Sequence, residues 1–98
     1  NKMFYYKIHK TEFGTLIAVC DNELSGKTLQ NKKLEIFVNP RFYGNEQIGE
    51  EIMELINNSN DGNVIGNNIV NLLLKNRVIT KNNVIKINGI AYAQFSVL

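Results

Sequence analysis

The chain has 98 residues, 44% of them hydrophobic, and a formal net charge of +2, which suits one domain over residues 1–98 and is less basic than a dedicated nucleic-acid-binding domain. No apolar stretch approaches the roughly 20 residues that span a bilayer, so we expect no membrane segment. A single cysteine, Cys20, excludes an internal disulfide and indicates a reducing, cytoplasmic setting.

The first part of the chain predicts strands. Residues 3–10 alternate in polarity, which is typical of a half-buried strand, and residues 15–20 form a second, more apolar run. The short segment between them predicts an antiparallel hairpin. We expect a single helical turn to follow Asp21 and to end at Gly26, and a third strand over residues 34–38.

Two helices are expected next. Asn45 can cap a helix that begins at Glu46, with an apolar stripe on one face and an acidic face opposite. The stripe is Ile48, Ile52, Leu55 and Ile56, and the acidic residues are Glu46, Glu50, Glu51 and Glu54. A second helix over about residues 64–76 is apolar nearly all round, which predicts deeper burial.

The end of the chain carries a hairpin signature. Asn88-Gly89 lies between two apolar runs, at 84–87 and 90–97, and this dipeptide favours a type I′ turn. The order β-β-β-α-α-β-β predicts an α+β fold, with an antiparallel or mixed sheet of about five strands and two helices packed on one face. The other face should be partly open, with Tyr5, Lys7, His9 and Phe37 as candidates to lie on it.

No set of residues in the sequence predicts a catalytic site. Ser25-Gly26-Lys27-Thr28 resembles the end of a phosphate-binding loop, but Asp21 stands where the first glycine is needed and Glu23 follows it. Cys20 beside Asp21 should have a raised thiol pKa, which does not suit a nucleophile. One histidine and one cysteine cannot hold a structural zinc. We therefore expect no enzyme activity, no metal and no cofactor.

Aromatic residues beside cations are the most suggestive functional pattern. Tyr5, Lys7, His9 and Lys10 share the first hairpin, and Arg41, Phe42 and Tyr43 are consecutive. Single-stranded nucleic acid is bound on aromatic platforms beside positive charge. The same alternation also occurs on any half-exposed strand, so the pattern leaves both interpretations open.

Several short motifs, in this order and spacing, carry a family resemblance. They are Ala18-Val19-Cys20-Asp21, Leu24-Ser25-Gly26-Lys27-Thr28, Phe42-Tyr43-Gly44, Asn63-Val64-Ile65-Gly66 and Ile87-Asn88-Gly89-Ile90-Ala91-Tyr92-Ala93-Gln94. Over nearly the whole chain they resemble the archaeal family catalogued as domain of unknown function 424. The resemblance implies an archaeal cytoplasmic protein of unestablished activity, and an association with RNA or the translation machinery.

The family motifs allow a structural and a functional interpretation. In the structural one, the glycines serve turns or close packing and Asn63 caps the second helix. In the functional one, Asp21, Lys27, Tyr43, Asn63 and Gln94 converge at one edge of the sheet as a polar binding site, and Arg41 and Phe42 add a cation and an aromatic ring.

The leading functional hypothesis is a non-catalytic binding module with RNA or a ribonucleoprotein as partner. The alternatives are a protein-interaction or homodimerisation module, and a small-molecule site at the loop from Asp21 to Lys27. The sequence leaves the choice between monomer and homodimer open.

Overall fold

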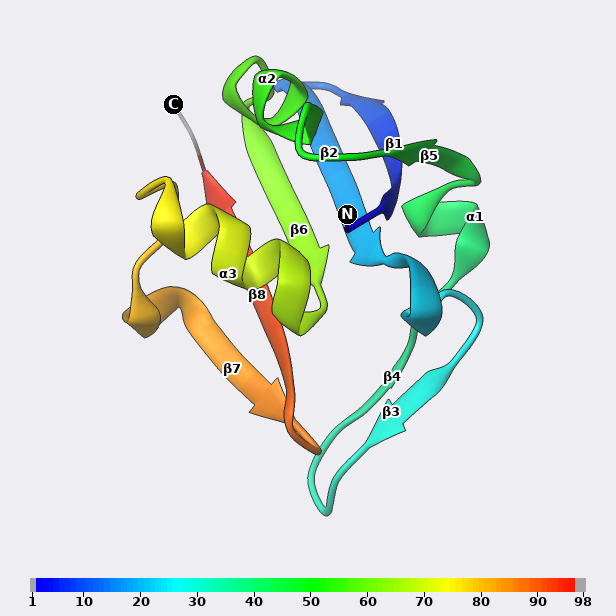
Figure 1. Cartoon of the computed structure of the whole chain (residues 1–98). Coiled ribbons are helices and arrows are strands. Elements are labelled where there is room, and N and C mark those ends of the chain that lie inside the picture. The colour runs from blue at the N-terminus through cyan, green and yellow to red at the C-terminus, as the bar shows by residue number, and fades with distance from the viewer. Residues whose placement is uncertain (1, 97–98) are drawn as a thin grey trace.

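The computed structural model describes residues 2–96 and contains a six-stranded mixed sheet in the order β5-β1-β2-β6-β8-β7 (Figure 1). Its strands are β1 (Phe4–Thr11), β2 (Gly14–Asp21), β5 (Glu46–Ile48), β6 (Asp61–Ile65), β7 (Val84–Ile87) and β8 (Ile90–Ser96). Strands β2 and β6 are parallel, and the other neighbours are antiparallel. The predicted α+β class with a mixed sheet is confirmed, with one more strand in the main sheet than expected.

Two helices, α2 (Ile52–Asn57) and α3 (Asn67–Lys75), pack on one face of the sheet, as predicted. Figure 1 shows α3 in front of the strands. Ile52 and Ile56 of α2, with Ile69 and Leu73 of α3, are fully buried in the core of this face. We call it the α3 face. No helix within residues 2–96 has the length and apolarity to cross a bilayer.

The opposite face is covered over only part of its area, which agrees with the expectation of a partly open face, since Lys7 and Gln94 on it are exposed. Its cover consists of α1 (Pro40–Tyr43) and a small separate sheet of β3 (Thr28–Gln30) and β4 (Glu35–Phe37). The strand expected at 34–38 therefore exists, but it pairs with β3 outside the main sheet. Phe37 lies on this small sheet and is half-exposed. We call this side of the main sheet the α1 face.

The helix expected from Glu46 is wrong in its first part. Residues Glu46–Ile48 form β5, which pairs with β1 over Phe4–Tyr6, so Asn45 caps no helix. The backbone gains ladder hydrogen bonds at the edge of the sheet there, which outweighs the weak helical preference of three residues. The four glutamates consequently do not lie on one helix.

The second helix begins three residues later than predicted. Val64 and Ile65 belong to β6, which lies between β2 and β8 and is buried on both faces. A short apolar run of this kind does not distinguish a central strand from a buried helix. Asn63 lies in the middle of β6 and caps no helix.

Two turns follow their sequence signals. Asn88 and Gly89 have φ angles of 51° and 81°, as a type I′ turn between β7 and β8 requires. After β2 a single 3₁₀ turn, η1 (Asn22–Leu24), is followed by Gly26 with φ 82°. A second 3₁₀ turn, η2 (Lys81–Asn83), leads into β7.

Candidate functional site

The strand register aligns Lys7, Asn63 and Gln94 in one row across the α1 face, with Ala18 between Lys7 and Asn63, and we call it the polar row. Lys7 lies opposite Ala18, Ala18 opposite Asn63, and Asn63 opposite Gln94. These positions span β1, β2, β6 and β8, which is three strand spacings of about 4.8 Å each, or roughly 14 Å. Ala18 is fully buried, whereas Lys7 and Gln94 are exposed at the two ends of the row.

A hydrogen-bonded group occupies the middle of this row. The Tyr43 hydroxyl donates to Oδ1 of Asn63 over 2.6 Å, and Nδ2 of Asn63 donates to the Tyr92 hydroxyl over 3.2 Å. Gln94 Nε2 also donates to the Tyr92 hydroxyl. We call Tyr43, Asn63, Tyr92 and Gln94 the tyrosine–amide cluster. It comes from α1, β6 and β8, three segments that are distant in the sequence.

Tyr43 is the buried end of the cluster. Its side chain is 3% exposed and packs with the apolar residues of the α1 face. Burial raises the pKa of Tyr43 well above its ordinary value, and the neighbouring Tyr92 acts in the same direction. The hydroxyl is therefore neutral at physiological pH and remains a hydrogen-bond donor to Asn63.

The local sequence of α1 fixes where Tyr43 points. The Asn39 side chain accepts from the backbone N–H of Arg41 over 2.9 Å, and Pro40 occupies the first helical position. Gly44 then ends the turn with φ 85°, and a Cβ there would collide with the carbonyl oxygen of Tyr6. This close approach holds α1 against β1.

An aromatic and basic group lies beside the cluster on the same face. The His9 ring stacks on Phe42 with centroids 4.9 Å apart, and His9 Nε2 lies 2.8 Å from the carbonyl oxygen of Phe42. Lys7 Nζ donates to the carbonyl oxygen of Arg41 over 3.0 Å. We call Lys7, His9, Arg41 and Phe42 the aromatic–basic edge. The two sequence patterns of aromatic and basic residues thus meet in space.

Asp21 lies on the α3 face, where its side chain stabilises the start of α3. Its carboxylate accepts from the backbone N–H groups of Asn68 and Ile69, both over 2.9 Å, at the first turn of α3. Gly66, with φ 127°, lies against this carboxylate so closely that a Cβ would collide with it. Burial raises the pKa of Asp21, and the two backbone hydrogen bonds partly oppose that shift.

Lys27 is an exposed residue between η1 and β3, and its backbone pairs with Val38 and Leu24. The carboxylate of Asp21 is already hydrogen-bonded to the first turn of α3. Lys27 and Asp21 therefore do not form one binding site in this loop. Cys20, the neighbour of Asp21, is fully buried, and burial raises its thiol pKa to about 12. The thiol is therefore not a nucleophile at neutral pH.

The structure brings some of the predicted binding residues together and keeps others apart. Tyr43, Asn63 and Gln94 come together as predicted, and Arg41 and Phe42 lie beside them. The convergence of all five polar residues is wrong, because alternate residues of a strand face opposite sides and Asp21 belongs to the α3 face.

Tyr92 is the member of the cluster that sequence reasoning missed. It accepts hydrogen bonds from both Asn63 and Gln94. The signal was present, because Tyr92 and Gln94 are two residues apart on a predicted strand and must share a face. The hydrogen bond from Asn63 to Tyr92 could not be predicted in this way, because Asn63 lies on the neighbouring strand β6.

Comparison with known proteins supplies the family. A crystal structure of an uncharacterized conserved protein from Methanopyrus kandleri has the same fold, with a TM-score of 0.80 at 17% sequence identity, over 98% of this chain and 92% of that one. A search of curated proteins finds no match. The family described as protein of unknown function (DUF424) matches residues 8–98. The chain therefore belongs to the DUF424 family.

Proposed function

We propose that the protein binds single-stranded RNA on the α1 face, without catalysis. The observation that supports this most is the combination of the polar row with the aromatic–basic edge. An exposed amide, Gln94, lies at one end, and a stacked pair of rings and two cationic residues lie at the other. The two exposed ends of the row lie roughly 14 Å apart, a distance that two or three splayed nucleotides can span.

Each chemical group has a counterpart in RNA. The amide of Gln94 offers a donor and an acceptor to the edge of a base, and its bond to Tyr92 limits its rotation. The ring of Phe42 is partly exposed beside His9 and can stack on a base. Lys7 and Arg41 can neutralise phosphates.

The charged residues of the α1 face indicate on which side of the bound RNA its phosphates should lie. Asp61 lies in the next row of the same face, where it accepts a hydrogen bond from Ser96 over 2.7 Å. A carboxylate repels phosphate, so we expect the phosphates on the side of Lys7 and Arg41. The bases then point toward the tyrosine–amide cluster.

The homodimer alternative has weaker support. Strand β7 is an edge strand with a half-exposed Ile85. However, two-fold pairing of β7 with its own copy in the register that puts Lys86 opposite Lys86 is opposed by like charges, because directly opposed side chains lie close together. We therefore place RNA binding first.

Fluorescence polarisation with a fluorescein-labelled ten-nucleotide RNA of mixed sequence tests the proposal. Two phosphate contacts predict that affinity falls about sevenfold between 50 and 200 mM salt. The double variant Lys7→Gln/Arg41→Gln should bind weakly and lose most of this salt dependence. Gln94→Ala should weaken binding while leaving the salt dependence unchanged, because it removes a base contact only.

Lys75→Gln is the matched control, because Lys75 is an exposed cation at the end of α3 on the opposite face. Its affinity for the RNA should equal that of the wild type. The proposal fails if binding is equal at the two salt concentrations, or if Lys75→Gln weakens binding as much as the double variant does.

A further inference from the structure

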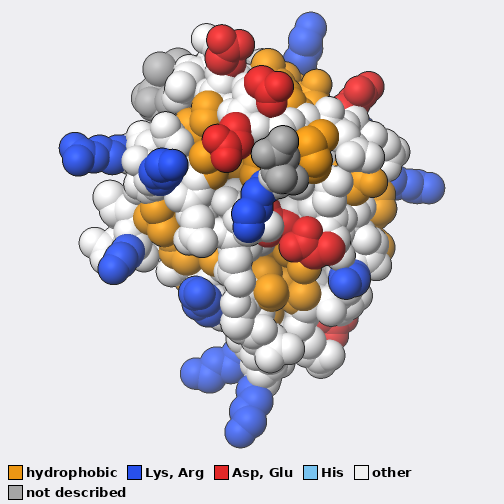
Figure 2. All heavy atoms as spheres, in the orientation of Figure 1, with side chains coloured by type: hydrophobic (Ala, Val, Ile, Leu, Met, Phe, Trp, Pro, Cys, Tyr) orange, Lys and Arg blue, Asp and Glu red, His pale blue; other side chains and the backbone are white. Residues whose placement is uncertain are grey.

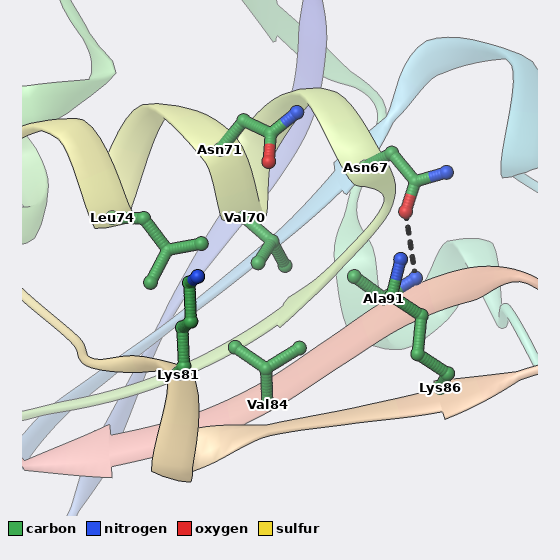
Figure 3. A pocket seen from close by; sticks show the side chains of 8 residues that line it. All are labelled: Asn67, Val70, Asn71, Leu74, Lys81, Val84, Lys86 and Ala91. Atoms are coloured by element: carbon green, nitrogen blue, oxygen red, sulfur yellow. Dashed lines mark hydrogen bonds between the residues drawn. The ribbon is translucent and has the colours of Figure 1, made fainter.

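A groove runs between α3 and strands β7 and β8, on the sheet face opposite the proposed RNA surface. Its volume is about 510 Å³, within the 300–1,000 Å³ range of small-molecule sites. The lining residues are Asn67, Val70, Asn71, Leu74, Lys81, Val84, Lys86 and Ala91 (Figure 3). The groove shares no residue with the tyrosine–amide cluster or the aromatic–basic edge, so it is independent of the proposed function.

The floor of the groove is apolar. Val70 on α3 and Ala91 on β8 are almost completely buried, and Leu74 and Val84 are partly exposed at its mouth. An aliphatic group that enters would remove from water its own surface and the exposed parts of Leu74 and Val84.

The rim of the groove is positively charged. Figure 3 shows the side chains of Lys81 and Lys86 on either side of Val84, both rising toward α3. Both lysines are exposed, and the lining includes no aspartate or glutamate. The space-filling view agrees, since apolar surface lies between Lys and Arg side chains over α3 and β7, whereas acidic side chains gather nearer α2 (Figure 2).

Asn67 fixes the width of the groove. Its Oδ1 accepts from the backbone N–H of Ala91 over 2.9 Å, and its Nδ2 donates to the carbonyl oxygen of Gly89 over 3.2 Å. These bonds tie the start of α3 to the β7–β8 hairpin. The amide of Asn67 is therefore occupied, which leaves the two lysines as the charged groups available to a ligand.

We propose that this groove binds a small amphiphilic anion, with a carboxylate or phosphate head and an aliphatic body. The head pairs with Lys81 or Lys86 at one end of the groove, and the body lies on Val70, Leu74 and Val84. Charge complementarity decides the class, because a neutral apolar ligand would leave both ammonium groups unused. An anion without an apolar body would likewise leave the partly exposed side chains of Leu74 and Val84 in contact with water.

Titration of the ¹⁵N-labelled full chain with octanoate and, separately, with octan-1-ol tests the proposal by NMR. The two probes have the same chain length and differ in head-group charge. Octanoate should shift the backbone amides of Val70, Val84 and Ala91, and should bind about tenfold or more tightly than octan-1-ol, as charge-assisted hydrogen bonds predict. Octyl phosphate in a third titration distinguishes a preference for phosphate from one for carboxylate.

The double variant Lys81→Gln/Lys86→Gln should weaken octanoate binding about tenfold or more and leave octan-1-ol binding unchanged. Lys75→Gln, an exposed cation on the same helix but outside the groove lining, is the matched control and should bind octanoate normally. The proposal is overturned if octan-1-ol binds as tightly as the two anions, or if the shifts map away from the groove. The wild-type titrations alone give these two outcomes, so the test does not depend on how the variants fold.

Discussion

Tyr43→Ala is expected to lower the free energy of unfolding by about 3–5 kcal/mol, the cost of emptying a buried aromatic site. The ring is 3% exposed and packs in the core of the α1 face, and its hydroxyl supplies the hydrogen bond to Asn63. Urea denaturation followed by circular dichroism measures the change. The variant should also lose RNA affinity, because α1 carries Arg41 and Phe42.

Tyr43→Phe separates packing from hydrogen bonding. It keeps the ring and removes only the donor to Asn63 Oδ1, which leaves a partly buried acceptor without its partner. A loss of about 1–3 kcal/mol is expected from that change. Equal losses for the two variants would show that the ring itself contributes nothing. A loss below about 1 kcal/mol for Tyr43→Ala would contradict the buried position.

Asp21→Ala is expected to lower the free energy of unfolding by about 2–4 kcal/mol, because two backbone donors at the start of α3 lose their acceptor. The hydrogen bond from the Asn68 N–H is partly buried, and the one from the Ile69 N–H is buried. Thermal and urea denaturation both report the change. Glu23→Ala removes an exposed carboxylate two residues away and should stay within about 0.5 kcal/mol of wild type.

The pH dependence gives a second readout of Asp21. Its pKa is raised in the folded state, chiefly by burial, so the protonated carboxyl favours the fold more than the ionised one. This contribution is complete below about pH 3.9 and is lost as the pH rises through the raised pKa of Asp21. Relative to Asp21→Asn, which does not titrate, the wild type should become less stable across that window. A constant difference between them would contradict the burial of this carboxyl.

The strands at the two ends of the chain could be predicted from sequence because their signals are local. Alternation along residues 3–10 and the Asn88-Gly89 turn are properties of neighbouring residues, and both predicted hairpins form. The segments at 46–48 and 61–65 could not be assigned in this way. Their strands exist because β1 and β2 offer unpaired backbone groups, and these partners are distant in the sequence.

The candidate site was likewise predicted from the sequence only in part. The sequence alone identified Arg41, Phe42 and Tyr43 as an aromatic and basic group, and Asn63 and Gln94 as polar residues of interest. The tertiary structure decided that the Tyr43 hydroxyl meets Asn63, that Tyr92 links the two amides, and that Asp21 instead holds the start of α3. The reason is geometric: a side chain's face depends on the register of its strand, and register is set by pairing with distant segments.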